Sequence, residues 1–121
     1  MWCRVLIVDD HPGFRAKARA LLAAAGYEVV GEAADGESAV RVATDLTPDL
    51  VLVDIQLPDI TGFEVVRLIG SVPDPPAIIL ISSRDAADYG RRIERSGALG
   101  FIAKAELSAR TLSALLTGAG P

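Results

Sequence analysis

Short apolar runs recur along the chain, and polar or amphipathic segments separate them. Four runs of predominantly apolar residues lie at 5–8, 50–53, 77–81 and 100–103. Runs of this length, bounded by polar residues and turn formers, predict strands covered on both faces, as in a parallel sheet. A further segment, residues 27–33, holds Val29 and Val30 but is less apolar. It predicts a strand at the edge of the sheet.

Helical periodicity appears between these strands. Residues 14–25 keep apolar side chains at helical spacing, and Gly26 follows as a C-terminal cap. Asp35 can cap a second helix. Thr61 and Glu64 fit a capping box, in which Thr61 satisfies a first-turn amide and Glu64 reaches back. A third helix is therefore predicted to begin at Thr61 and to end near residue 70.

The last two helices are more weakly marked. A fourth is predicted over residues 85–96, with Gly90 inside it and a thin apolar stripe of Ala86 and Ile93. Ser83 is its predicted cap, and we expect it to be the least firmly held helix. A fifth is predicted from the leucines between residues 107 and 116, fading at Gly118. Strands that alternate with helices predict an α/β fold: a doubly wound, five-stranded parallel sheet.

Length and composition narrow the class of protein. The 121 residues predict one domain over 1–121, half of the residues are hydrophobic, and the formal net charge is −4. These values argue against a disordered chain and against direct contact with nucleic acid. Cys3 is the single cysteine, which agrees with a reducing cytoplasm. The apolar runs are too short to cross a membrane, so a cytoplasmic protein is predicted.

Polar side chains follow the central strands where each one ends. Asp9 and Asp10 follow the first, Asp54 ends the third, Ser82 ends the fourth and Lys104 closes the fifth. The carboxyl ends of parallel strands share one edge of a sheet, where such folds bind their ligands. The sequence therefore predicts that these five side chains form one site.

The residue types at this edge suit phosphoryl chemistry. Carboxylates held together need a cation, and Mg2+ or Mn2+ suits the carboxylates together with the backbone carbonyl of Gln56. Asp54 could then attack phosphorus as a nucleophile. Lys104 would share the charge on the phosphoryl oxygens, and the Ser82 hydroxyl would donate to one of them.

Several motifs together resemble the receiver domains of two-component response regulators, over nearly the whole chain. They are Val-Asp-Asp-His-Pro at 8–12, the stretch 48–58 around Asp54, Gly-Phe-Glu at 62–64, Ile-Ser-Ser at 81–83 and the stretch 97–104 that ends at Lys104. The acidic opening followed by Arg15, with Gly-Glu-Ala at 31–33 and Asp-Gly-Glu at 35–37, resembles the NarL/FixJ-type receivers in particular.

This resemblance implies a CheY-like fold with strand order 2-1-3-4-5 and a phosphoryl group taken from a sensor histidine kinase onto Asp54. It implies Mg2+ held by Asp10, Asp54 and the Gln56 carbonyl, with Asp9 acting through water. Ser82 and the aromatic Phe101 would reposition, changing the face around the fourth helix, fifth strand and fifth helix. That face would control an output domain or partner protein, and dimerisation on phosphorylation is common in the family.

The resemblance implies a signalling domain, with self-catalysed phosphotransfer and dephosphorylation, rather than a turnover enzyme. We hypothesise that the side chains of Gln56 and Arg84 tune dephosphorylation. The sequence departs from the family at Thr61, where Asp or Asn is common, and a threonine still caps a helix. NarL/FixJ-type members usually continue into a helix-turn-helix domain, whereas this sequence carries no output domain and predicts either a stand-alone receiver, or an excised one.

Other interpretations of these residues remain open. Asp9 and Asp10 could be ordinary turn residues, and His11 is interpreted as a structural or surface residue. Phe101 could be core as well as a switch. The arginines of the fourth helix indicate a solvated face or a docking surface for a partner; they are Arg84, Arg91, Arg92 and Arg95.

Three other functions compete with phosphoryl transfer as interpretations of the acidic site. A flavodoxin-like carrier is disfavoured because Asp9 and Asp10 would repel a flavin phosphate. A haloacid-dehalogenase-type phosphatase needs a second acid where Gln56 stands. The strongest alternative is a pseudo-receiver, a protein-interaction module that works without phosphorylation.

Overall fold

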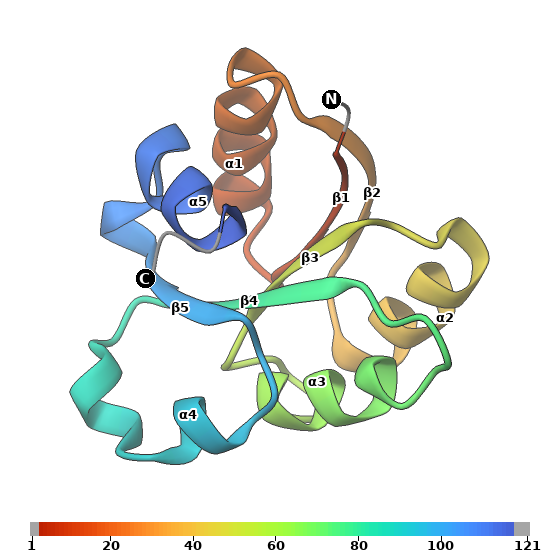
Figure 1. Cartoon of the computed structure of the whole chain (residues 1–121), viewed down its shortest axis with the longest axis vertical. Coiled ribbons are helices and arrows are strands. Elements are labelled where there is room, and N and C mark those ends of the chain that lie inside the picture. The colour runs from red at the N-terminus through yellow and green to blue at the C-terminus, as the bar shows by residue number, and fades with distance from the viewer. Residues whose placement is uncertain (1–2, 118–121) are drawn as a thin grey trace.

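The computed structural model describes residues 3–117, which fold as five strands with helices between them (Figure 1). The elements in chain order are β1 (Arg4–Val8), α1 (Pro12–Ala24), β2 (Glu28–Ala33), α2 (Gly36–Leu46), β3 (Leu50–Asp54), α3 (Gly62–Gly70), β4 (Ala77–Ser82), the 3-10 helix η1 (Ala86–Tyr89), α4 (Arg92–Arg95), β5 (Gly100–Ala103), the 3-10 helix η2 (Lys104–Glu106) and α5 (Ala109–Leu116).

The five strands form one parallel sheet in the order β2-β1-β3-β4-β5. Figure 1 shows α1 and α5 on one face of this sheet and α2, α3 and the α4 segment on the other. The predicted fold class and strand order are confirmed. The less apolar β2 lies at an edge, as its composition predicted.

The sheet separates two hydrophobic clusters. Val5 and Ile7 of β1 belong to the cluster that includes Ala18 and Leu22 of α1, while Leu6 and Val8 face the helices on the other side. β3 is buried along its whole length. This explains why the central strands read as continuous apolar runs rather than as alternating ones.

Two of the predicted helix caps form. The Asp35 carboxylate accepts a hydrogen bond from the Ser38 amide at 2.8 Å, and Thr61 Oγ1 accepts one from the Glu64 amide at 3.2 Å. The second half of the predicted capping box is wrong, because the Glu64 side chain pairs with Arg67 on the next turn.

The prediction of one continuous helix over residues 85–96 is wrong. The segment divides into η1 and α4, separated by Gly90 with φ +58°, a conformation that glycine tolerates and other residues rarely adopt. Ala86, assigned to the apolar stripe, is exposed, and the buried residue is Tyr89. Asp85 rather than Ser83 stands at the N-cap position.

The last helix begins later than its leucines suggested, because Ser108 caps it through a hydrogen bond from the Thr111 amide at 3.1 Å. Leu107 precedes it, and Gly118 lies outside the described residues. Within residues 3–117, every helix is too short or too polar to cross a lipid bilayer.

Candidate functional site

Two buried carboxylates lie side by side at the carboxyl ends of β1 and β3. Val8 pairs with Val53 across these strands, so Asp9 and Asp54 are the next residues in register. Asp9 is fully buried and Asp54 is 2% exposed. Buried carboxylates are costly unless other groups compensate their charge.

Lys104 supplies compensating charge; it is the first residue of η2 and directly follows β5. Its Nζ atom lies 2.6 Å from Asp9 Oδ2 and 3.2 Å from Asp54 Oδ2. The Phe14 ring, at the start of α1, lies 4.7 Å from the same nitrogen and provides a cation–π contact. The ammonium group thus bridges both acids, which come from separate strands.

The surroundings shift the pKa values of this ion pair. Burial is the main cause that raises the pKa of Asp54, and the neighbouring Asp9 charge adds to it, while the Gln56 amide at 3.1 Å and Lys104 act in the opposite direction. Burial acts to lower the pKa of Lys104, but its contacts with Asp9 and Asp54 outweigh this and raise it. The lysine therefore keeps its charge.

The same acids could hold a divalent metal ion. Ligand atoms of Asp9, Asp10, His11 and Asp54 all lie within 4.8 Å of one another. Asp9 Oδ2 and Asp10 Oδ1 are buried, and their neighbours are the Lys104 Nζ atom at 2.6 Å and the His11 Nδ1 atom at 3.2 Å. Three carboxylates gathered in one cluster are the oxygen ligands that a hard cation such as Mg2+ prefers. The donor set present therefore fits the cation that the sequence predicted.

His11 lies closer to this cluster than the sequence indicated. Its Nδ1 atom is 3.0 Å from Asp9 Oδ1 and 3.2 Å from Asp10 Oδ1, and its side chain is 67% exposed. The imidazole ring lies on the solvent side of Asp9 and Asp10. Its position directly after Asp9 and Asp10 was the only sequence signal for this contact.

Arg15 of α1 contacts the backbone of the loop that carries Asp9 and Asp10. Its Nη1 atom donates to the Asp9 carbonyl at 2.6 Å, and its Nε atom donates to Glu32 at 2.9 Å. Arg19 donates to the same carboxylate, and these arginine contacts lower the pKa of Glu32, with the Arg19 hydrogen bond as the largest cause. Sequence reasoning used Arg15 only as part of a motif and missed this role.

Ser82 is buried at the end of β4, but its hydrogen bonds do not reach the acids. Its hydroxyl lies 2.7 Å from the Tyr89 hydroxyl and accepts from the Arg84 amide at 3.0 Å. Phe101 is partly buried beside Tyr89, with ring centroids 6.3 Å apart. Sequence reasoning missed Tyr89; an aromatic residue in an otherwise weak helix was the available signal.

The two predicted tuning residues lie in the loops at this end of the sheet. Gln56 follows β3, and its amide hydrogen-bonds to Asp54. Arg84 follows β4, and both side chains are exposed. The structure thus brings Asp9, Asp54 and Lys104 into contact and holds Asp10 in the same acidic cluster. Ser82, Gln56 and Arg84 lie at or just beyond the same ends of β3 and β4, whereas Phe101 contacts Tyr89.

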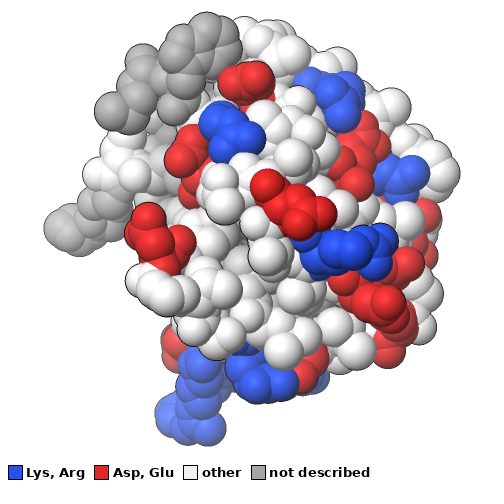
Figure 2. Space-filling view, turned by 90° about the vertical axis from the view of Figure 1, so that its right-hand side faces the viewer, with Lys and Arg blue, Asp and Glu red and all other residues white. Residues whose placement is uncertain are grey.

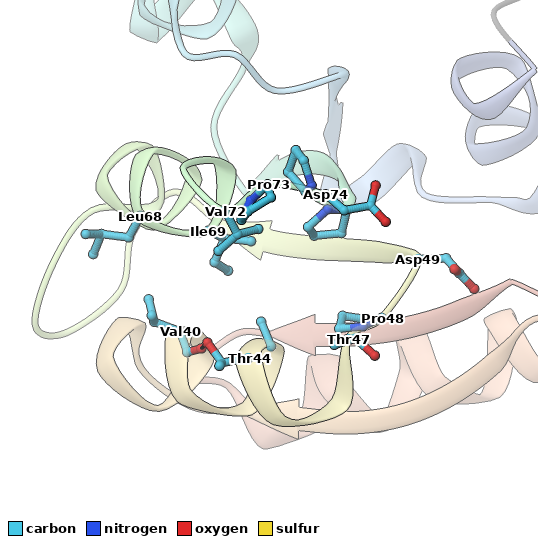
Figure 3. A pocket seen from close by; sticks show the side chains of 13 residues that line it. Val40, Thr44, Thr47, Pro48, Asp49, Leu68, Ile69, Val72, Pro73 and Asp74 are labelled. Carbon is cyan, nitrogen blue, oxygen red and sulfur yellow. Dashed lines mark hydrogen bonds between the residues drawn. The ribbon is translucent and has the colours of Figure 1, made fainter.

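A hollow lies at the opposite end of the sheet. It has a volume of about 640 Å³ between the C-terminal ends of α2 and α3, and Figure 3 shows Thr44, Pro48, Leu68 and Val72 among its lining. Asp49, at the start of β3, belongs to it, whereas Asp54 ends that strand. Its lining is mainly apolar and includes the carboxylates of Asp49 and Asp74, and none of the residues predicted for the site belongs to it.

The face that bears α2 and α3 has no single sign of charge. Figure 2 shows acidic and basic side chains interspersed among uncharged ones. This face lacks the broad basic field that binding to nucleic acid requires.

Comparison with known proteins gives one consistent result. Residues 5–116 match the family model described as the response regulator receiver domain. The DNA-binding transcriptional activator EvgA of Escherichia coli K12 is 34% identical over 84% of this chain and 50% of its own length.

Solved structures give the same result. The crystal structure of a LuxR-family two-component response regulator from Aurantimonas sp. SI85-9A1 is 32% identical, has a TM-score of 0.87, and covers 98% of this chain and 87% of its own. The chemotaxis response regulator CheY4 of Vibrio cholerae is 28% identical with a TM-score of 0.82, covering 97% of this chain and 98% of its own. The chain spans about half the length of the curated relatives it matches.

Proposed function

Because the chain belongs to the response regulator receiver domain family, we propose that it accepts a phosphoryl group on Asp54 from a sensor histidine kinase, in a Mg2+-dependent reaction. The single observation that carries the proposal is the placement of Asp54: a buried carboxylate that ends the central strand, beside Asp9 and in contact with Lys104. The membership itself makes the chain a signalling domain rather than a classical enzyme.

The proposed transfer uses one oxygen of Asp54 as the nucleophile. This oxygen attacks the phosphorus of a phosphohistidine, an O–P bond forms, and the P–N bond breaks. The electron pair of the broken bond stays on the imidazole, which then takes a proton from solvent. The product is an aspartyl phosphate on this chain and a free histidine on the kinase.

Lys104 has two successive tasks in this proposal. Before transfer it bridges Asp9 and Asp54 and so offsets their mutual repulsion. During transfer the same ammonium group donates to a phosphoryl oxygen, where negative charge develops. Asp9, Asp10, Asp54 and the Gln56 carbonyl would hold the Mg2+ ion, which when bound neutralises further charge on the phosphoryl oxygens.

Water reverses the modification in the proposed cycle. The attack of water on phosphorus regenerates the Asp54 carboxylate and releases inorganic phosphate. The side chains of Gln56 and Arg84 stand in the loops that flank the site, so we assign them the tuning of this rate. An output domain or partner protein receives the signal, and relatives named as transcription regulators support control of transcription as the output.

Intact mass spectrometry tests the proposal directly. The protein is incubated with acetyl phosphate and Mg2+, and we expect the gain of one phosphoryl group. Asp54→Asn should abolish the gain, while Asp45→Asn, at an exposed position on α2, should leave it unchanged. Chelation by EDTA should suppress it. No gain in the unaltered protein would refute the proposal and favour an interaction module that works without phosphorylation.

A further inference from the structure

The Ser82 hydroxyl is held on the side of η1. It is fully buried, lies 2.7 Å from the Tyr89 hydroxyl, and accepts a hydrogen bond from the Arg84 amide. No hydrogen bond joins it to Asp54 or Lys104 within residues 3–117. Both hydrogen-bond contacts of the Ser82 hydroxyl therefore run to the segment that leads into α4.

A serine hydroxyl has one proton and sits in one of three staggered rotamers. Contacts with both Tyr89 and Arg84 fix the Oγ atom in one of them. To donate to a phosphoryl oxygen on Asp54, the hydroxyl must turn toward the acidic cluster. The contact with Tyr89 and the proposed contact with the phosphoryl group then compete for the same side chain.

Tyr89 links η1 to α4 through a shared contact with Phe63. Its ring packs edge-on against Phe63, with centroids 5.8 Å apart, and Arg92 of α4 lies over the same Phe63 ring at 4.4 Å. α4 has no buried residue of its own, and Gly90 separates it from η1. Tyr89 is therefore the buried attachment point of a segment that is otherwise loosely held.

We propose that Tyr89 is a positioning residue that holds Ser82 in the resting state, and that phosphorylation of Asp54 breaks the Ser82–Tyr89 hydrogen bond and frees the η1–α4 segment. The inference rests on the proposed function. Phe101, the aromatic of β5, lacks a hydroxyl and cannot make this bond, so the hydrogen-bonding partner of Ser82 comes from η1 instead.

The first test uses fluorine NMR to measure how tightly the site binds beryllium fluoride, a phosphoryl mimic, in the presence of Mg2+. Tyr89→Phe keeps the ring but removes the hydroxyl that stabilises only the resting state. We expect it to bind the mimic about fivefold more tightly, the factor that corresponds to one ordinary hydrogen bond. Tyr27→Phe is the matched control, and its affinity should equal that of the unaltered protein.

The role of Tyr89 through Ser82 is tested in a Ser82→Ala background. There the Tyr89→Phe change should no longer alter affinity, because no hydroxyl remains to be held. If Tyr89→Phe, with Ser82 present, binds beryllium fluoride no more tightly than the unaltered protein, the inference is overturned. Weaker binding would show that the Tyr89 hydroxyl stabilises the phosphorylated state instead of the resting state. An effect that persists without Ser82 would also overturn it.

A second measurement uses the unaltered protein. The chain has two tyrosines, so selective labelling gives two ring signals. Beryllium fluoride with Mg2+ should shift the Tyr89 signal and leave that of Tyr27 in place; an unmoved Tyr89 signal would contradict the inference. If the unaltered protein neither gains phosphoryl mass nor binds the mimic, the proposed function has failed and this inference falls with it.

Discussion

Gly62 is predicted to be the residue at which a single added methyl group does most damage to the site. A Cβ atom at Gly62 would lie 2.6 Å from the Asp54 carbonyl oxygen and 2.7 Å from the Ile55 Cα atom. Both are backbone atoms at the end of β3, so no side chain can rotate away. The Gly62 amide also donates to the Ile55 carbonyl at 2.8 Å, which holds the start of α3 against this point.

The magnitude follows from these distances. Ordinary contact begins near 3.4 Å, so α3 and the end of β3 must separate by about 0.8 Å in Gly62→Ala. Overpacking that moves backbone in a dense interior costs about 3 kcal/mol of the free energy of unfolding. Because the displaced atoms are the backbone of Asp54 and of Ile55 next to it, we also expect slower gain of the phosphoryl group from acetyl phosphate.

Urea unfolding and intact mass spectrometry measure the two effects. Gly70→Ala is the matched control: Gly70 ends the same helix, and an added Cβ would meet nothing within 4 Å. It should raise the free energy of unfolding by roughly 0.5 kcal/mol, since alanine favours the helical backbone more than glycine does. A Gly62→Ala protein as stable as the unaltered one, with the same phosphorylation rate, would refute this reasoning.

Three further outcomes are expected. Lys104→Gln should lower the free energy of unfolding, measured with urea in EDTA, by about 3 kcal/mol, because it leaves Asp9 and Asp54 buried without their cation. Mg2+ should restore part of this stability, and an equal loss with and without Mg2+ would contradict the prediction. Burial raises the pKa of Asp54 in the folded chain, so the folded state binds the proton more tightly than the unfolded chain does. This contribution to the free energy of unfolding is complete below the pKa of Asp54 in the unfolded chain, and it is lost as pH rises through the higher pKa of the folded state. Asp54→Asn should therefore gain stability relative to the unaltered protein as pH rises through this range in EDTA, and a constant difference would count against it. Asp59→Ala should lower the melting temperature because Asp59 accepts hydrogen bonds from the first amides of α2 at 2.8 and 2.9 Å, whereas Asp45→Ala should not.

The fold was largely predictable because its signals are local. The apolar runs of β1, β3 and β4 lie between helices on both faces, and a fully covered strand has no polar face to interrupt its sequence. Asp35 and Thr61 cap their helices through amides three residues away, which a sequence pattern can indicate. The order of the strands came from the family resemblance, and the structure confirms it.

The fourth helix shows where local patterns fail. Its spacing favoured Ala86 as a buried position, yet the chain turns at Gly90 and buries Tyr89 against Phe63 instead. A short segment with little apolar surface takes its conformation from the packing it can find, so tertiary contacts override its helical pattern.

The amino-acid sequence alone was enough to predict the alternation of strands and helices and the polar side chains that follow the strands. Those features depend on neighbours along the chain and on the common direction of parallel strands. Three contacts emerged only from the folded chain: Lys104 with Asp9 and Asp54, Arg15 with the Asp9 carbonyl, and Ser82 with Tyr89. These contacts join residues through rotamers and packing between separate elements, and no periodicity along the chain encodes them.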